Sequence, residues 1–275
     1  MIKEFNINTN ISVKDFLKDN ISANLLTKVT TKNLIFVNNQ NVCNYYLMKP
    51  GDVLRIVIPK VETNVECENQ DIDIVYEDDY LIVLNKPNNV ATIPTRKHYN
   101  ISLANYLAYY YVKKGINVGV HFASRLDYAT GGLLMAAKNI YVLDLLSKTK
   151  IEKKYLLKVK GLMEDSSVST KIIKDPNSII KRMNVEGNTA RTTFKLLSYL
   201  KDEDASVVEA TLHTGKTHQI RLHVKYLNHT IIGDQIYGEE DGETLHLHSY
   251  YLSFIHPITK QKMEFINYPK WYNEK

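Results

Sequence analysis

The segment Ser124–Lys138 combines charged residues, a turn and an apolar run in an order that could do chemistry. Arg125 and Asp127 precede a Thr-Gly-Gly turn at 130–132, and the apolar run follows as a predicted buried strand. This order places a carboxylate at the edge of a sheet, where an ionised Asp is costly unless a cation pairs with it. The simpler interpretation is that Asp127 caps the turn before the strand, because Asp is common in turns.

A second segment, Thr211–Val224, places Arg221 in the first turn of a predicted amphipathic helix. Gly215 ends a strand, Thr217 can serve as the helix N-cap, and apolar residues recur after it at helical spacing. Because the N-terminal end of a helix already carries partial positive charge, an arginine there does not stabilise the helix. We therefore expect a carboxylate elsewhere to hold Arg221, with an ordinary surface arginine as the alternative.

A third segment, Lys153–Gly161, predicts a strand with two different faces. Tyr155, Leu157 and Val159 alternate on one face, and lysines lie largely on the other. A buried tyrosine at a sheet edge usually serves packing, but its phenol could also act as a general base or a hydrogen-bond group. The lysines would suit an RNA phosphate backbone, or they simply form a solvated face.

Seven of the nine histidines lie between His213 and His256, which raises the question of a metal site. His213, His218 and His223 recur every five residues across a predicted change from strand to helix, so they would not share a face. No cysteine lies near them and no His-Glu-x-x-His pattern occurs, so we expect no metal. A Gly-rich phosphate loop and a Gly-x-Ser-x-Gly elbow are also missing from the sequence.

The elements that must position these residues belong to a globular chain of 275 residues, with 44% hydrophobic and 24% charged residues. Its apolar runs reach about five residues, well short of the roughly 18–20 that a membrane span needs. Two cysteines cannot form a disulfide framework, and the first residues lack the apolar stretch of a secretory signal. We therefore expect a cytoplasmic protein without a membrane partner.

Charge divides the chain into three parts. Residues 1–60 carry eight basic and four acidic side chains, and residues 61–80 carry eight acidic and no basic ones. The net charge of +5 thus leaves +9 for residues 81–275, a mild hint of a polyanionic partner. We predict an acidic linker at 61–72 between a small domain and a larger domain at 73–275.

Element signals differ between the two predicted domains. The small domain indicates two short helices, near 13–17 and 24–28, followed by a small sheet. In the larger domain, Ser102 and Asn139 can each cap a helix. Strand-like runs there lie at 154–160, 191–198, 206–213 and 246–254. Because strands and helices do not alternate regularly, we predict an α+β fold with a mixed, mainly antiparallel sheet and flanking helices, preceded by a small α+β domain.

Taken together, these segments resemble the RluA-type family of pseudouridine synthases, which isomerise uridine to pseudouridine in ribosomal or transfer RNA. The resemblance covers roughly residues 72–270. One such motif is a weak sign, whereas six in the family's order are a strong one. They are a strand with a Lys-Pro turn at 75–87, Arg-Leu-Asp-x-x-Thr at 125–130, Lys-x-Tyr at 153–155, Thr-Gly-Lys-Thr-His-Gln-Ile-Arg-Leu-His at 214–223, Ile-Gly-Asp-Gln-Ile-Tyr-Gly at 232–238, and a closing pattern at 245–257.

The resemblance implies roles for individual residues. Asp127 aligns with the family's essential aspartate, which breaks the N-glycosidic bond by attack at the anomeric carbon or by taking the adjacent ribose proton. Tyr155 aligns with a tyrosine that helps to deprotonate the base carbon, and Arg221 with an arginine that pairs with the catalytic carboxylate. Arg125 aligns with an arginine that enters the RNA stack where the target nucleotide is flipped out. Further substrate contacts are implied for Leu126, Thr130, Lys154, Lys216 and His218.

The implied reaction transfers no electrons and consumes no second substrate, so we expect no cofactor. The expected partner is ribosomal large-subunit RNA or transfer RNA, bound by a monomer. The small domain resembles the RNA-binding domain that often precedes this catalytic domain, but its lysines are scattered, so a degenerate copy is the alternative.

Two positions depart from the family pattern. Ser124 stands where the family usually has His, and Gly131 where it usually has Ser. Because both flank the catalytic loop, we expect altered loop packing or RNA contacts with activity retained. Two rival functions are a non-catalytic RNA-binding factor on the same fold and a hydrolase that uses Asp127 with nearby histidines.

Overall fold

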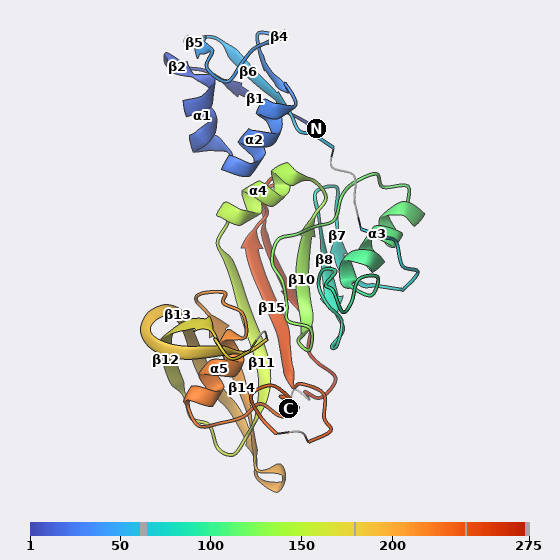
Figure 1. Ribbon diagram of the computed structural model, residues 1–275, viewed down its shortest axis with the longest axis vertical. Coiled ribbons are helices and arrows are strands. Elements are labelled where there is room, and N and C mark those ends of the chain that lie inside the picture. The colour runs from blue at the N-terminus through green and yellow to red at the C-terminus, as the bar shows by residue number, and fades with distance from the viewer. Residues whose placement is uncertain (61–64, 179, 240, 273–275) are drawn as a thin grey trace.

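The first sixty residues form a four-stranded antiparallel sheet in the order β1-β6-β3-β4, with two helices beside it (Figure 1). Both helices begin at a serine, because the hydroxyls of Ser12 and Ser22 accept hydrogen bonds from Asp15 N and Leu25 N. The elements are β1 Ile2–Asn6, β2 Ile11–Ser12, α1 Val13–Asn20, α2 Ala23–Thr31, β3 Ile35–Val37, β4 Gln40–Asn41, β5 Leu47–Met48 and β6 Val53–Val57. We call this part the N-terminal unit.

This computed structural model describes residues 1–60, 65–178, 180–239 and 241–272. Residues 61–64, the start of the predicted acidic linker, lie outside the described residues. No helix in the described ranges is both long and apolar enough to cross a lipid bilayer.

The rest of the chain builds one ten-stranded sheet, the main sheet, in the order β12-β13-β14-β11-β15-β10-β8-β7, with β16 beside β15 and β9 beside β10. Of the described strand pairs only β10–β15 is parallel, which confirms the predicted mixed, mainly antiparallel sheet. The elements are β7 Asp73–Glu77, β8 Leu81–Lys86, α3 Leu103–Lys113, β9 His121–Phe122, β10 Gly131–Ala137, α4 Ile140–Lys148, β11 Ile151–Lys160, β12 Ser166–Lys174, β13 Arg182–Leu200, β14 Ala205–Leu212, α5 Gln219–Tyr226, β15 Leu247–Ile255 and β16 Lys262–Ile266.

Strands β8 and β10 are buried on both faces, which explains their continuous apolar runs. Alternate side chains point to opposite faces of a strand. Thus Ile82 packs in one cluster with Leu107 of α3, and Val83 packs in another with Leu146 of α4. The predicted caps of these two helices, Ser102 and Asn139, are confirmed.

Helix α4 also contacts the N-terminal unit. Ile140 and Tyr141 of α4 belong to the same buried cluster as the core of that unit. The Asp144 carboxylate accepts a hydrogen bond from Ser22 N at 2.9 Å, next to the start of α2, where partial positive charge favours an anion. Figure 1 shows the N-terminal unit next to α4 at one end of the main sheet.

Candidate active site

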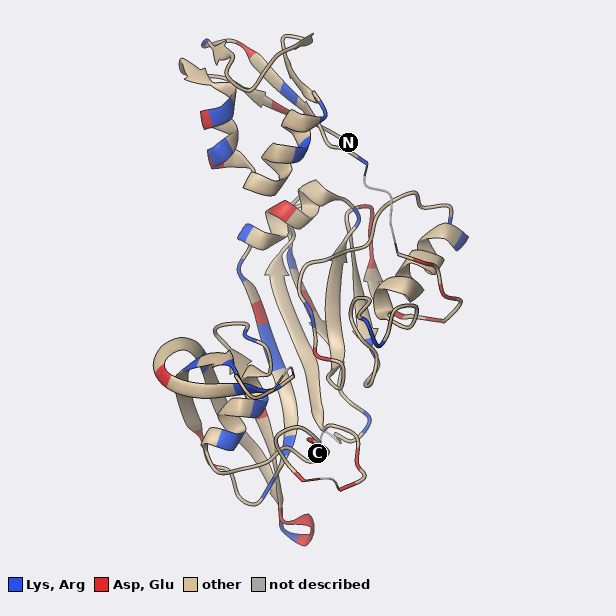
Figure 2. Ribbon diagram, in the orientation of Figure 1, with Lys and Arg blue, Asp and Glu red and all other residues tan. Residues whose placement is uncertain are grey.

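A cavity of about 210 Å³ opens beside Asp127. Five parts of the chain line it: Asn89 after β8, the turn at 127–129 before β10, the start of α5 with His218 and Arg221, Ile180 between β12 and β13, and loop residues between 233 and 245. Lys and Arg residues occur along α5 and around β12 and β13 (Figure 2). The cavity is therefore a meeting point of segments that lie far apart in the sequence.

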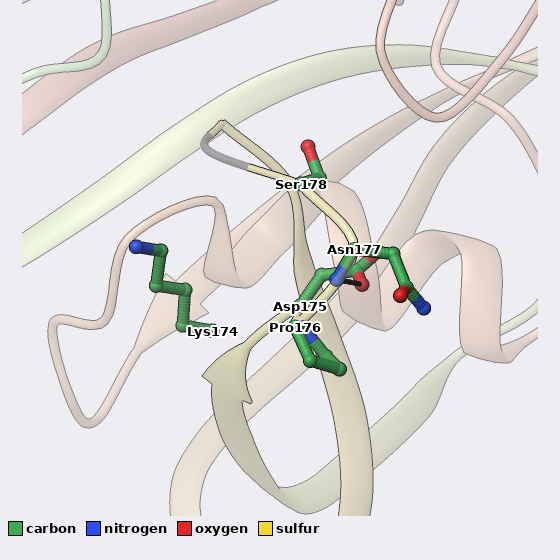
Figure 3. Close-up of a pocket in the computed structure, with 5 residues that line it drawn as sticks. All are labelled: Lys174, Asp175, Pro176, Asn177 and Ser178. Atoms are coloured by element: carbon green, nitrogen blue, oxygen red, sulfur yellow. Dashed lines mark hydrogen bonds between the residues drawn. The ribbon is translucent and has the colours of Figure 1, made fainter.

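A second hollow, of about 340 Å³, lies in the turn at 174–178 between β12 and β13. Its lining comes entirely from that turn, in which Asn177 N donates a hydrogen bond to the Asp175 carboxylate at 2.8 Å (Figure 3). None of the residues predicted for the site lines this hollow. We therefore build the site around Asp127.

The backbone of Asp127 is held by hydrogen bonds, whereas its side chain is partly exposed. Its carbonyl accepts a hydrogen bond from Thr130 N at 3.1 Å, and Leu126 N and O both bond the Thr92 hydroxyl, at 3.2 and 2.8 Å. The Asp127 side chain is 30% exposed. Leu126 and Thr130, predicted as substrate contacts, are buried beneath the turn and do not line the cavity.

Lys86 supports the same turn from below. Its ammonium donates hydrogen bonds to the carbonyls of Pro87, Val90 and Tyr128 at 2.8, 2.7 and 3.2 Å, and the residue is 1% exposed. Burial lowers the pKa of Lys86 to about 7, and the negative charge of Asp127 opposes that shift. The sequence showed Lys86 only as part of a Lys-Pro turn, because nothing local indicates that the end of β8 lies under the Asp127 turn.

Among the described residues, His218 is the basic side chain within 4.0 Å of the Asp127 carboxylate, with Nε2 3.9 Å from Oδ2. The Tyr237 hydroxyl accepts a hydrogen bond from Arg182 N at 2.8 Å and lies 2.8 Å from His218 Nδ1. Its own proton is therefore available to Nδ1, which leaves the imidazole proton on Nε2, facing Asp127.

The backbone and charge of His218 follow from its position. Burial lowers its pKa; Asp127 opposes this shift, and Arg221 and Arg182 add to it. The imidazole is thus neutral at pH 7. His218, with a φ of 59°, is also the N-cap of α5, so the predicted cap at Thr217 is wrong. The left-handed backbone turns the chain sharply enough to place both His218 and Arg221 at the cavity.

Arg221 binds a different carboxylate from the one predicted. Its Nε donates to Asp234 Oδ2 at 2.8 Å and its Nη2 to Asp234 Oδ1, and both side chains are almost fully buried. No ion pair within 4.0 Å joins Arg221 to Asp127. The expected need for a carboxylate is met, but the predicted pairing with Asp127 is wrong.

Asp234 is the better partner because it lies in the same buried wall. Two backbone N–H groups, of Ile236 and Tyr237, also donate to its Oδ1 at 3.0 and 2.9 Å. Burial alone would raise the pKa of Asp234, but Arg221 and these N–H groups outweigh it and lower the pKa. The donors of Arg221 are therefore occupied by Asp234, and Arg221 acts on Asp127 only through the electrostatic potential of the cavity.

Tyr155 lies in the core next to the site. It is 6% exposed and its backbone pairs with Ser249 of β15, at a register shift that begins at Lys154. Burial raises the pKa of the phenol; Ser249 opposes this shift and the charge of Asp127 adds to it. Tyr155 therefore keeps its proton at neutral pH.

The two predicted lysine contacts lie off the cavity. Lys154 pairs with Glu209 at 3.3 Å and lies over the ring of Tyr251. Lys216 is exposed in the loop before α5. Arg125, by contrast, is exposed beside Asp127, with no carboxylate within 4.0 Å among the described residues.

A buried hydrogen-bond chain lies behind α5. Gln219 Nε2 donates to the Thr192 hydroxyl at 2.9 Å, so that hydroxyl donates in turn to His223 Nδ1 at 2.8 Å. The Thr170 hydroxyl donates to Asn184 Oδ1 at 2.9 Å and therefore accepts from His223 Nε2 at 3.0 Å. His223 is thus a neutral ring that ties α5 to β12 and β13, and burial lowers its pKa to about 4.

Gly131, one of the two departures, has a packing reason. A Cβ at this position would lie 2.4 Å from Asn88 Oδ1. The Asn88 amide donates to the carbonyls of Ala129 and Leu245 at 2.8 and 3.0 Å, and so joins the Asp127 turn to the segment before β15. The absence of a side chain at Gly131 thus leaves room for the Asn88 amide.

No group of three or more His, Cys, Asp or Glu side chains in the described residues is arranged to hold a metal ion. What the cavity offers is a partly exposed carboxylate, a neutral imidazole and a fixed guanidinium, with a protonated phenol nearby. This set suits chemistry that moves a proton or forms a bond at one carbon of a bound molecule.

Comparisons with known proteins agree on one family. The family model described as RNA pseudouridylate synthase matches residues 80–226. The chain is 35% identical to the uncharacterized RNA pseudouridine synthase YjbO of Bacillus subtilis, over 93% of this chain and 94% of the relative. It is 31% identical to ribosomal large subunit pseudouridine synthase D of Borreliella burgdorferi, over 91% and 84%. The structure of human RNA pseudouridylate synthase domain containing 1 shares the fold, with a TM-score of 0.60 and 24% identity over 74% of this chain and 85% of that chain.

Proposed function

The chain belongs to the RluA-type family of RNA pseudouridine synthases, which are isomerases, and on this premise we propose that it converts a specific uridine of ribosomal or transfer RNA to pseudouridine through Asp127. The observation that carries the proposal is the state of that carboxylate. It faces a cavity that can take a flipped base, it is 30% exposed, and no Lys or Arg lies within 4.0 Å of it among the described residues.

The reaction rearranges bonds within one nucleotide. The bond from ribose C1′ to uracil N1 breaks, the uracil turns, and C1′ bonds to C5. The proton on C5 then leaves, and N1 gains a proton, so the product is an isomer of the substrate. Whether Asp127 attacks C1′ or takes the adjacent ribose proton, the step needs an oxygen lone pair that no strong cation occupies. The geometry around Asp127 supports both routes.

The neighbours of Asp127 supply position and charge. The neutral His218 directs its Nε2 proton toward the carboxylate, and Arg221 keeps a positive charge in the cavity wall while it remains bound to Asp234. Tyr155 keeps its proton, so we propose that it helps to deprotonate the uracil C5 only as its own proton moves on. Lys86 fixes the turn from below.

Ribosomal large-subunit RNA is the substrate that we favour, because relatives that match over most of this chain are named ribosomal large subunit pseudouridine synthases. We propose that Arg125, which is exposed and lies two residues before Asp127, enters the space left by the flipped uridine. We further propose that the N-terminal unit, at 1–60, contacts the RNA away from the cavity and that the enzyme acts as a monomer.

Mapping pseudouridines across total RNA, in cells with and without this protein, tests the proposal. We expect loss of one or a few pseudouridines in the deletion strain, with restoration by the wild-type gene and not by Asp127→Asn. A map that does not change would contradict the proposal. Restoration by Asp127→Asn would instead support a role of the protein as a non-catalytic RNA-binding factor.

A further inference from the structure

A stacked pair of aromatic rings lies at the edge of the cavity. The rings of His98 and Tyr128 are 4.7 Å apart between centroids and 19° apart in plane. Tyr128 directly follows Asp127, lines the cavity and is 44% exposed. One face of the Tyr128 ring is thus covered by His98, while much of the side chain stays open to solvent.

Two cations lie at the tip of the turn that carries His98. Thr95 and His98 pair as an antiparallel bridge, with their N–H groups bonding each other's carbonyls at 3.3 and 3.1 Å. Arg96 and Lys97 therefore form the two-residue tip, and both are exposed. Within the described ranges neither of them has a carboxylate within 4.0 Å. Their charges are available to an external anion.

Tyr128 is held by hydrogen bonds to its backbone turn and by the stacked ring of His98. Its carbonyl accepts a hydrogen bond from Lys86 at 3.2 Å, and the next carbonyl, of Ala129, accepts one from Asn88 at 2.8 Å. His98 supports the ring from one side. A ring fixed in this way loses little conformational freedom when a flat group stacks on it.

An exposed ring beside unpaired cations matches the chemistry of a single-stranded nucleic acid. Bases stack on aromatic side chains, and basic side chains bind the adjoining phosphates. Core packing does not account for this tyrosine, because a side chain exposed by 44% buries only part of its ring.

We propose that Tyr128, backed by His98, stacks on the base next to the flipped uridine, while Arg96 and Lys97 bind the phosphate beside that base. The inference rests on the proposed function and adds to it a second contact, besides Arg125, that holds the opened RNA strand. We call His98, Tyr128, Arg96 and Lys97 the stacking platform. Because every base has a π face, the platform requires a base next to the uridine but has little preference among the four bases.

The first test is direct binding of a probe. A seven-nucleotide RNA with a central uridine carries 2-aminopurine at its 5′ or 3′ neighbour, and its fluorescence is titrated with full-length protein. We expect quenching on one side of the uridine with the wild type, and loss of that quenching with Tyr128→Leu. Tyr226→Leu, the same change at an exposed tyrosine at the far end of α5, serves as the control. Equal quenching by Tyr128→Leu and the wild type overturns the proposal.

The second test uses kinetics on a stem-loop that contains the mapped uridine. Tyr128→Leu is expected to raise KM by about 5- to 150-fold, which corresponds to the stacking of one base, with little change in kcat. Tyr128→Phe keeps the ring and should return KM toward the wild-type value. An abasic neighbour should raise the wild-type KM and remove most of the difference between wild type and Tyr128→Leu.

If the abasic neighbour raises KM by the same factor in the wild type and in Tyr128→Leu, the two groups do not contact each other. That result would overturn the stacking contact. The proposed function fails separately. A wild-type protein that forms no pseudouridine in any RNA contradicts that function, whereas an active wild type with an unchanged KM in Tyr128→Leu contradicts only the stacking platform. The quenching experiment decides the platform in either case, because it needs no turnover.

Discussion

The rim and the wall of the Asp127 cavity differ in how completely their polar groups are paired. At the rim, formed by Asp127 and Tyr128, the side chains are 30% and 44% exposed. In the wall, Arg221 and Asp234 form a buried bidentate pair with side chains 3% and 2% exposed. The polar groups of the rim are therefore available to a ligand, whereas those of the wall are fixed by their partners.

Behind the wall, the His223 chain extends the same principle. Each of its two hydroxyls donates one hydrogen bond and accepts one, and the direction of each bond is set by its neighbours. Such networks hold one arrangement because any other leaves a buried polar atom unpaired. Changes in the wall should therefore act first on stability, and changes at the rim first on activity.

The largest expected effect is at the rim. Asp127→Asn keeps the shape of the side chain and removes the charge, so pseudouridine formation should fall by at least about 10³-fold. The unfolding free energy should change by less than about 0.5 kcal/mol, because the basic group within 4.0 Å of the carboxylate among the described residues is the neutral His218, 3.9 Å away. Single-turnover assays and urea denaturation measure the two quantities. A large loss of stability would remove the distinction between rim and wall.

Arg221→Met should produce the opposite result in the wall. It leaves Asp234 buried without its cation, which costs about 3–5 kcal/mol of unfolding free energy. Replacing both partners, as in Arg221→Met with Asp234→Leu, should recover most of that loss, because no charge is left unpaired. Urea denaturation of the single and double variants gives the coupling. If the single variant is as stable as the wild type, Asp234 is not the partner that matters.

The His223 chain makes the stability of the wall depend on pH. The folded pKa of about 4 lies below the ordinary value of 6.5, so between these pH values the unfolded state binds more protons than the folded state. The contribution, roughly 3 kcal/mol, is complete above pH 6.5 and is lost as the pH falls through about 4. Urea denaturation at pH 7 and pH 4.5 should show a smaller drop for His223→Gln than for the wild type. Equal drops would contradict the neutral ring.

The smallest effect concerns the anchor of the rim. Gly131→Ser should lower the unfolding free energy by about 1–3 kcal/mol, because its Cβ collides with the Asn88 amide. Asn88→Ala clears that space, so the pair of changes should cost less than the sum of the single ones. Thermal denaturation of the three variants measures the coupling. Additive losses would show that Asn88 does not fill the space left by Gly131.

Local signals predicted much of the fold. Ser102 and Asn139 begin helices as expected, because an N-cap depends only on a short side chain and the next three N–H groups. The runs near 154–160 and 206–213 became β11 and β14. β12 was missed, since its alternation of Ser, Thr and Lys with few apolar residues gives a weak strand signal. The cap of α5 was also missed, because a left-handed backbone is uncommon at non-glycine residues and an N-cap is expected at a short polar side chain such as Thr217.

The candidate site divides in the same way. The segments that carry Asp127, Tyr155 and Arg221 were found from residue types and spacing, and the structure brings Asp127 and Arg221 to one cavity with Tyr155 in the adjoining core. The partner of Arg221 was not predictable, because Asp127 and Asp234 are both acidic and only burial distinguishes them. Lys86 shows the same limit, since its three carbonyl partners depend on the turn that folds over β8.

Local patterns and ordered motifs in the sequence were enough to predict the family, the mainly antiparallel sheet and the segments that carry Asp127 and Arg221. Which carboxylate stays exposed and which is paired follows from the packing of the folded chain. That choice depends on how much water reaches each group and on which backbone N–H groups surround it, and both are properties of the packed chain. Asp127 and Asp234 look alike in the printed sequence, and their different surroundings support a catalytic role for one and a structural role for the other.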